Sequence, residues 1–242
     1  MTTRLHLGLE TATDRLSIAV RTPDGEVVEE VLEGARRHAS ALVPLVDRLV
    51  RRAGGGPAAI GLVAVAEGPG SFTGLRVGAA VAKAIAIAGG IPMWSAPSLL
   101  VRASGIAHPG ETVVAVASAL RGELFTGVWE FHPDGSISER LSPRALPATG
   151  LASLPTAHRA CGEGPPDLIE AVARQVGAPV LGPPASHPSA AVLLRLVGVR
   201  GGAVQVVSPA RWEPVYGRPA EAQVQWELRH ERPFPDSERQ AG

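Results

Sequence analysis

The sequence predicts an α/β protein made of two related lobes, and three observations carry the prediction. Each half contains a strand-like run, a loop and a second strand-like run, followed by the tripeptide Pro-Asp-Gly at residues 23–25 and 133–135. In the first half, an apolar run at 60–66 leads through glycines into an alanine-rich helical pattern. A His-Pro-Gly break at 108–110 separates the halves. A pattern that recurs at comparable spacing is typical of a duplicated structural unit.

Length and composition restrict the class of protein. The 242 residues suit one large domain or two small lobes, and 45% of them are hydrophobic, as in soluble globular proteins. The 23 basic and 23 acidic residues cancel, which disfavours a chain that binds nucleic acid by itself. The single cysteine, Cys161, excludes an intramolecular disulfide and is expected to be a small buried residue.

The N-terminal residues show no basic segment before a long apolar core, and no apolar span of 18 residues is evident further on. We therefore expect a cytoplasmic protein.

The first lobe is expected to begin with an antiparallel sheet, formed by strand-like runs at 5–10, 16–21 and 26–32. A helical period follows at 40–52, and its apolar stripe consists of Leu42, Leu45, Val46 and Leu49. Val43 and Val50 widen this apolar face. A wide face is typical either of a deeply buried helix or of a helix shared with a partner subunit, and both alternatives stay open.

The glycine-rich unit follows the strand predicted at 60–66. It reads GPGSFTGLRVGAAVAK over residues 68–83, with Ser71 or Thr73 as the candidate helix cap. Glycine recurs every fourth residue, and alanine continues the series, at positions 70, 74, 78, 82 and 86. The loop could contact an anion or nucleotide through its backbone N–H groups. The alternative is a tight turn with a closely packed helix, because both common phosphate-binding glycine fingerprints are incomplete.

Two basic residues of this unit, Arg76 and Lys83, lie seven positions apart on one helix face. Solvent, a phosphate or a partner carboxylate could each occupy that face.

The remaining elements follow from the same patterns. In the first half we expect a short strand near 91–94 and a helix from about residue 97. In the second half we expect strands at 112–118, 122–131, 158–162 and 179–181, and helices at 166–176 and 188–199. The predicted division is an N-terminal lobe at 1–108, a C-terminal lobe at 109–208 and a C-terminal segment at 209–242. The first part of that segment should pack on the body, and residues 229–242 should be loose.

Candidate catalytic chemistry is sparse. The seven histidines form neither HxxxH nor HExxH, so no metal site is expected. Glu10, at the end of the first strand, is the best acidic candidate and could hold Mg²⁺ through water. The corresponding position of the second lobe is Ser118, so a two-sided metal clamp would be incomplete. We therefore expect Glu10 to be a solvated strand-end residue.

The segment AVAEGPGSFTGLRVGAAVAKAIA resembles the signature of the bacterial TsaB (YeaZ) family. Further segments fit along the chain: LGLETAT, PMWSAPSLL, ALRGELFTGVWEF and EPVYGRPAEA. The resemblance spans about residues 4–222 and is weakest at 140–200.

The resemblance implies a duplicated ribonuclease H-like motif, as in actin, sugar kinases and Hsp70 ATPases. It also implies a non-catalytic scaffold that supports TsaD, the metal-dependent subunit that places threonylcarbamoyl on the adenosine next to the anticodon of ANN-decoding tRNAs. The family resembles TsaD itself, whose HxxxH motif has no counterpart near residues 98–108 here.

Partners and cofactors follow from the same resemblance. A TsaB-like chain forms a homodimer alone, a heterodimer with TsaD and a larger complex with the ATPase TsaE. ATP, Mg²⁺ and metal are expected on partner subunits, and tRNA is expected only through the complex. The implied partner interface lies on the first two helices, at His38, Leu42, Val43, Leu45, Val46, Leu49, Val50, Gly74, Arg76, Val77, Gly78, Val81 and Lys83.

Two departures from the family pattern concern the region between the lobes. Glu10 and Ala12 stand where the family has Asp and Ser, and Ser118 replaces an acid. A nucleotide cleft would involve Glu10, Thr11, Gly68, Gly70 and Ser71, and both departures weaken it. The alternative function is a metal- or ATP-dependent enzyme, peptidase-like or small kinase-like, and direct RNA binding is a third class that the neutral charge disfavours.

Overall fold

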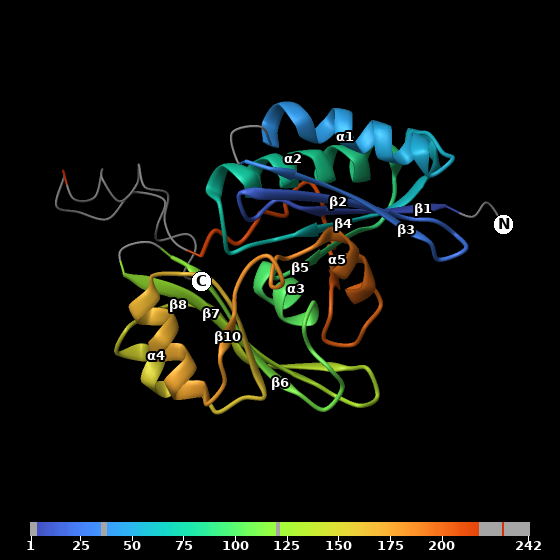
Figure 1. The fold of residues 1–242 in the computed structure, drawn as a ribbon. Coiled ribbons are helices and arrows are strands. Elements are labelled where there is room, and N and C mark those ends of the chain that lie inside the picture. Colours follow the sequence, from blue (N-terminus) through green and yellow to red (C-terminus); the bar gives the residue numbers. More distant parts are fainter. Residues whose placement is uncertain (1–3, 35–37, 120–121, 218–228, 230–242) are drawn as a thin grey trace.

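The computed structural model describes residues 4–34, 38–119, 122–217 and 229 of the chain. Two mixed sheets form its framework (Figure 1). The first has the order β11-β5-β4-β1-β2-β3 and consists of β1 (Leu5–Glu10), β2 (Arg15–Arg21), β3 (Val27–Glu33), β4 (Ile60–Ala66), β5 (Met93–Ala96) and β11 (Val204–Gln205). The second has the order β10-β9-β6-β7-β8 and consists of β6 (Thr112–Ser118), β7 (Glu123–Phe131), β8 (Ile137–Pro147), β9 (Arg159–Gly162) and β10 (Val180–Leu181).

The two sheets share one topology. In each, three antiparallel strands are followed by two strands that join the other side of the first strand in parallel. The short strand β11 then extends the first sheet beyond β5. This repetition confirms the predicted duplication of one α/β unit.

The two Pro-Asp-Gly turns have the same hydrogen bonds. In the first, Thr22 N donates to Glu26 O and Gly25 N donates to Thr22 O, at 2.8 and 3.0 Å. In the second, His132 and Gly135 make the equivalent bonds at the same two distances. Both turn glycines have positive φ, 94° and 81°, which side chains disfavour. The Pro-Asp-Gly sequence therefore gives both hairpins the same turn geometry.

The helices form three layers around the sheets (Figure 1). Two long helices, α1 (His38–Arg52) and α2 (Phe72–Gly89), cover the outer face of the first sheet, and α4 (Pro166–Val176) covers the outer face of the second. Between the sheets lie α3 (Ser98–Ser104) and α5 (Ala190–Leu196).

The two inner helices are exchanged between the lobes. The helix α3, which follows β5 of the first sheet, packs on β6, β7 and β9 of the second. The helix α5, which follows β10, packs on β1, β2 and β4 of the first. Their apolar side chains share one central core with both sheets. The lobe boundaries predicted at residues 108 and 208 stay predictions, because α3 and α5 each pack on the sheet that the other half of the chain forms.

Most predicted elements are present, with shifted ends. The third strand runs one residue later than expected, β5 begins at Met93, and α5 is shorter than the predicted 188–199. The first helix begins at His38, two residues before the apolar period. Four further elements were not expected: the long strand β8, the short strand β11 and the 3-10 turns η2 (Pro57–Ala59) and η3 (Gly150–Ser153).

The expectation that no apolar span of 18 residues occurs is wrong. Helix α2 is long and apolar enough to cross a membrane by length and composition. It nevertheless packs against α1 and β4 in the first lobe, where Leu75 and three of its alanines are buried.

Candidate functional site

The glycine face of α2 lies against the segment that follows β1. A Cβ atom added at Gly70 would lie 2.2 Å from Ala12 O, and one at Gly74 would lie 2.0 Å from Thr11 O. At Gly78 it would lie 2.3 Å from Thr11 Oγ1. These separations are shorter than any ordinary contact, so the glycines allow the backbones to approach. Of the two interpretations of the glycine unit, an anion contact or a closely packed helix, this geometry supports the closely packed helix.

The loop before α2 uses several of its N–H groups within the chain. Ser71 is the helix cap, because its Oγ accepts from Gly74 N at 3.3 Å, while Thr73 is not. Ser71 N donates to Ala12 O at 2.7 Å, and Gly68 N donates to Ser98 Oγ at 3.1 Å. These donors are therefore satisfied without an anion, which weakens the phosphate-contact alternative.

The expectation that Glu10 is solvated is wrong. Its side chain is fully buried, at 0% exposure, with Oε1 accepting from Ala12 N at 2.8 Å. Burial raises the pKa of Glu10 to about 7, although the Ala12 N–H and the charges of Arg102 and Arg15 oppose the shift. Oε2 has no hydrogen-bond partner among the described residues. The sequence showed only a strand end, and contacts from distant segments bury it.

A pocket of about 400 Å³ lies between the lobes. Of the predicted cleft residues, Gly70 and Ser71 line it, whereas Glu10, Thr11 and Gly68 do not. Ser118 lines the pocket and is exposed, whereas Glu10, at the corresponding strand end of the first lobe, is buried. A Mg²⁺ ion held through water by Glu10 does not fit this arrangement, because the carboxylate does not face the pocket.

Sequence analysis missed three charged residues that line this pocket, Asp14, Arg102 and Glu163, and Arg102 is the most buried of them. It lies on α3 and is 2% exposed, and its guanidinium donates to Glu163 Oε1 at 2.7 Å and to Ser186 Oγ at 3.4 Å. Since the first contact spans 61 residues of sequence and the second 84, no local pattern could reveal them. Both residues of this ion pair line the pocket.

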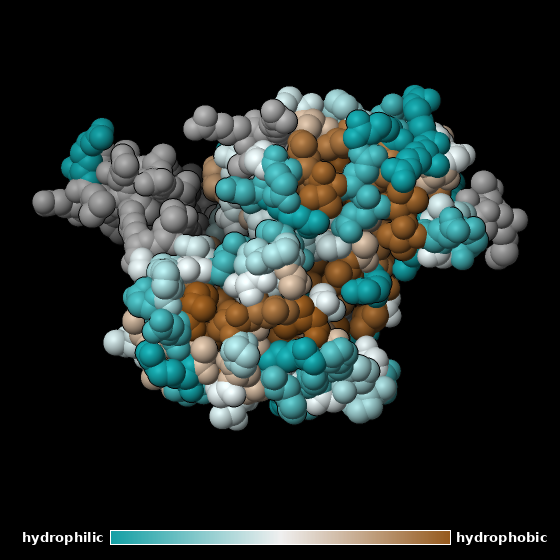
Figure 2. All heavy atoms as spheres, viewed as in Figure 1, coloured by the Kyte–Doolittle hydropathy of each residue, from teal (hydrophilic) through white to brown (hydrophobic). Residues whose placement is uncertain are grey.

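An apolar groove of about 770 Å³ lies on the outside of the first lobe, between α1 and α2. Its walls include Val43 and Val46 of α1 and Val81 and Ile85 of α2. Val43 is 58% exposed. Figure 2 shows brown, apolar surface over these helices within a border of polar residues. Exposed apolar surface of this kind is typical of a protein interface.

The predicted interface residues differ in how far the structure exposes them. Leu42, Leu49, Gly74 and Gly78 are buried in their own lobe, so they present no side-chain surface to a partner. Val43 and Arg76 are exposed, and Leu45, Val77, Val81 and Lys83 are half-buried. Val46 and Val50 are buried but line the groove. The side chain of His38 lies outside the described part of the chain. The role of the remaining residues in partner binding stays a prediction.

The first part of the C-terminal segment packs on the body, as expected. Lys83 Nζ donates to Trp212 O at 2.6 Å and contacts Glu213 Oε1 at 2.7 Å. Val215 N donates to Glu67 O at 2.7 Å, and the ring of Tyr216 lies 4.6 Å from that of Phe72. Sequence analysis left solvent, a phosphate or a partner carboxylate as possible contacts of Lys83. In the structure, Lys83 binds the C-terminal segment of its own chain. The prediction for 229–242 lies almost wholly outside the described residues.

Metal-binding and nucleophilic side chains show no assembled site. In the described ranges, no three His, Cys, Asp or Glu side chains cluster so as to hold a metal ion. Cys161 is fully buried, as predicted, and burial raises the pKa of its thiol to about 12. A thiol with so high a pKa is a packing residue rather than a nucleophile.

The duplicated sheets with exchanged inner helices define a two-lobed protein of the actin, sugar kinase and Hsp70 ATPase type. A family model described as "TsaD: tRNA N6-adenosine threonylcarbamoyltransferase" matches residues 21–133. The solved structure "YeaZ from Pseudomonas aeruginosa" superimposes with a TM-score of 0.68 and 27% identity, covering 81% of this chain and 91% of that one. A second chain from the same organism, described as similar to peptidase YeaZ, has a TM-score of 0.70 and 28% identity, covering 90% and 100%.

Two curated relatives are named tRNA threonylcarbamoyladenosine biosynthesis protein TsaB. The Bacillus subtilis protein is 26% identical over 233 residues, which is 91% of this chain and 96% of the relative. The Escherichia coli protein is 29% identical over 131 residues, 53% of this chain and 56% of the relative. The chain belongs to the TsaB (YeaZ) family.

Proposed function

We propose that this chain is a non-catalytic scaffold subunit in the threonylcarbamoyl modification of tRNA, and that it acts by binding and supporting TsaD. The observation that carries the proposal is the apolar groove between α1 and α2, with Val43 more than half exposed at its edge. Family membership supplies the pathway, because the curated relatives are named for threonylcarbamoyladenosine biosynthesis.

A partner with the same helix pair suits this groove. The TsaD model matches the stretch of this chain that includes α1 and α2, so TsaD is related to this chain over its helix pair. Two related helix pairs can bury their apolar faces against each other by an approximate two-fold axis. A second copy of this chain and TsaD would then compete for one surface. The homodimer would form alone, and the heterodimer would replace it when TsaD is present.

The other partners belong to the same proposal. In this proposal TsaE binds the assembled subunits, and tRNA is bound only through the complex. The complex is cytoplasmic. Nucleotide, Mg²⁺ and catalytic metal would reside on the partners. The buried carboxylate of Glu10 supports this division, because the competing enzyme hypothesis needs that carboxylate to face a ligand.

The decisive experiment mixes the purified chain with its cognate TsaD and measures binding by calorimetry and sizing. We expect a one-to-one complex at the expense of the homodimer. Val43→Glu should weaken both assemblies at least tenfold, since a buried unpaired charge at an interface is costly. Leu181→Glu, at a similarly exposed apolar position on β10, serves as the matched control and should leave both unchanged. Absence of a complex with TsaD would refute the scaffold role, and a Val43→Glu variant that binds normally would move the interface elsewhere.

A further inference from the structure

A further cavity, of about 360 Å³, lies between the end of α3, the turn from β7 to β8 and α5, away from the groove and the glycine loop. Three segments form its walls: residues 104–109 after α3, the turn from β7 to β8, and the end of α5. Direct backbone bonds hold these segments together. Ile137 N donates to Arg200 O at 2.8 Å, and Gly110 N donates to Phe131 O at 2.6 Å. The cavity is therefore preformed, with a volume in the range that small ligands use.

The ionisable residues among its described lining are all bases. They are His108, His132 and Arg195, and no carboxylate is among them. The apolar part of the wall includes the buried side chains of Phe131, Ile137 and Leu196. The lining thus combines an apolar wall with one arginine and two histidines.

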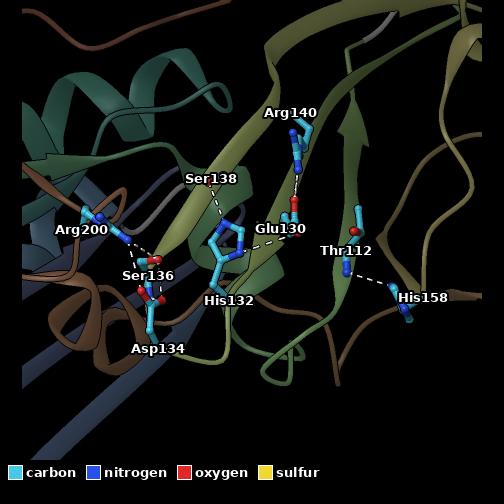
Figure 3. Close-up of polar contacts among 9 residues, drawn as sticks. All are labelled: Thr112, Glu130, His132, Asp134, Ser136, Ser138, Arg140, His158 and Arg200. Atoms are coloured by element: carbon cyan, nitrogen blue, oxygen red, sulfur yellow. Dashed lines mark hydrogen bonds and ion pairs between the residues drawn. The ribbon is translucent and has the colours of Figure 1, made fainter.

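The arginines of this region differ in how they are neutralised. Arg140 binds Glu130, Arg159 contacts Glu111 at 2.7 Å, and Arg200 contacts Asp134 at 3.1 Å. Figure 3 shows the first and the last of these pairs. Arg195, on α5, has no hydrogen bond or ion pair with any residue that the structure describes. Of these four arginines, Arg195 is therefore the one whose guanidinium can pair with an anion from outside the chain.

The two histidines already have partners. His132 Nε2 lies 2.7 Å from Ser138 Oγ, and its Nδ1 faces Glu130 (Figure 3). His108 Nδ1 lies 2.8 Å from the Arg159 guanidinium. Ser104 Oγ, by contrast, is buried on the cavity wall without a partner among the described residues. An incoming acceptor would satisfy this hydroxyl.

We propose that this cavity binds a small organic carboxylate with a short apolar body. The carboxylate would lie against the Arg195 guanidinium and accept from the Ser104 hydroxyl, and its hydrocarbon part would contact Ile137 and Leu196. One free guanidinium matches one negative charge with two acceptor oxygens. The site is independent of the TsaD-binding proposal, because it lies on other elements.

The test is an NMR titration of the isotope-labelled full chain with butyrate, and with butyramide as its neutral analogue of the same shape. We expect butyrate to shift the Ile137 methyl and Arg195 side-chain signals saturably, while butyramide shifts neither to saturation. Arg195→Gln should weaken butyrate binding at least tenfold, since it removes a charge-assisted contact. Arg174→Gln, an exposed arginine of α4 that pairs with Glu170, removes the same charge elsewhere and should change nothing.

Three results would overturn the proposal: no saturable butyrate shift, equal binding of butyramide, or unchanged binding by Arg195→Gln. Ser104→Ala should weaken butyrate binding several-fold while its spectrum stays native-like. Because Arg195 is exposed and unpaired among the described residues, its substitution should not disturb folding.

Discussion

The two lobes share a strand order but differ in how their outer helices pack. In the first lobe, α2 buries glycines and alanines beside the single large side chain of Leu75, and the glycines bring its backbone close to Thr11. In the second lobe, the equivalent helix α4 buries Leu168, Val172 and Val176 in the usual way. The larger side chains Val81 and Ile85 lie beside the glycine face of α2, where they are half-buried and line the groove. One topology thus produces an exposed apolar groove in one lobe and an ordinary buried core in the other.

A second difference lies between β3 and β4. The first lobe places the long helix α1 there, whereas the second lobe places η3 between β8 and β9. Without a counterpart of α1, the second lobe cannot form a two-helix groove. The comparison therefore explains why the apolar groove belongs to the first lobe.

The largest expected effect comes from filling the close approach in α2. Gly74→Val should lower the free energy of unfolding by roughly 3 to 4 kcal/mol, because its Cβ would meet backbone that cannot move aside. Denaturant unfolding measures this loss. Ala80→Val, on the exposed side of the same helix, should cost well under 1 kcal/mol. Equal effects at both positions would show that the glycine face is not closely packed.

The next prediction concerns the pH dependence of stability that Glu10, at the end of β1, should cause. In the folded protein the pKa of Glu10 is about 7, above its ordinary value of 4.5, so the folded state binds more protons between these values. Its contribution to stability is then fully present below about pH 4.5 and declines as the pH rises towards 7. Glu10→Gln should remove this decline and raise stability at pH 8 by up to about 3 kcal/mol.

Unfolding curves from pH 5 to pH 8 would check this result. Ser118, the exposed counterpart in the second lobe, provides the control, and Ser118→Ala should leave the pH profile unchanged. An identical pH dependence in Glu10→Gln would mean that another group titrates.

The exchanged inner helices can be tested through α5. Ser17 Oγ donates to Glu29 and accepts from Ala190 N at 2.8 Å, which joins β2 to the start of α5. Ser17→Ala should cost about 1 to 3 kcal/mol and increase hydrogen exchange in α5, because it leaves a buried N–H without its acceptor. Ser142→Ala, an exposed serine of β8 that bonds to Glu139, should have little effect. Unchanged exchange in α5 would show that other contacts hold the helix.

The smallest effect is expected at the C-terminal segment. Lys83→Ala should lower global stability by less than about 1 kcal/mol, because its partner Glu213 is exposed. It should nevertheless speed hydrogen exchange at residues 212–216, since Lys83 also binds Trp212 O. Arg51→Ala, which removes an exposed pair with Asp47 on α1, should leave that segment unaffected.

Much of the first lobe could be predicted from sequence because its signals are local. The Ile60–Ala66 strand, the Ser71 cap and the two Pro-Asp-Gly turns depend on residues a few positions apart. Periodicity and turn chemistry act over that distance. The candidate site was predicted less well, because the predicted interface included both Leu42, which is buried in its own lobe, and Val43, which lines the groove.

The sequence by itself determined the duplicated unit, its turns, the small residues of α2 and the burial of Cys161. The tertiary structure alone decided that Glu10 is buried, that Lys83 binds a segment about 130 residues away, and that α3 and α5 pack on each other's lobes. The physical reason is that burial and charge pairing depend on groups brought together from distant parts of the chain. Ala190, for example, meets Ser17 across 173 positions. Local patterns specify an element and its apolar face, whereas long-range packing determines what that face contacts.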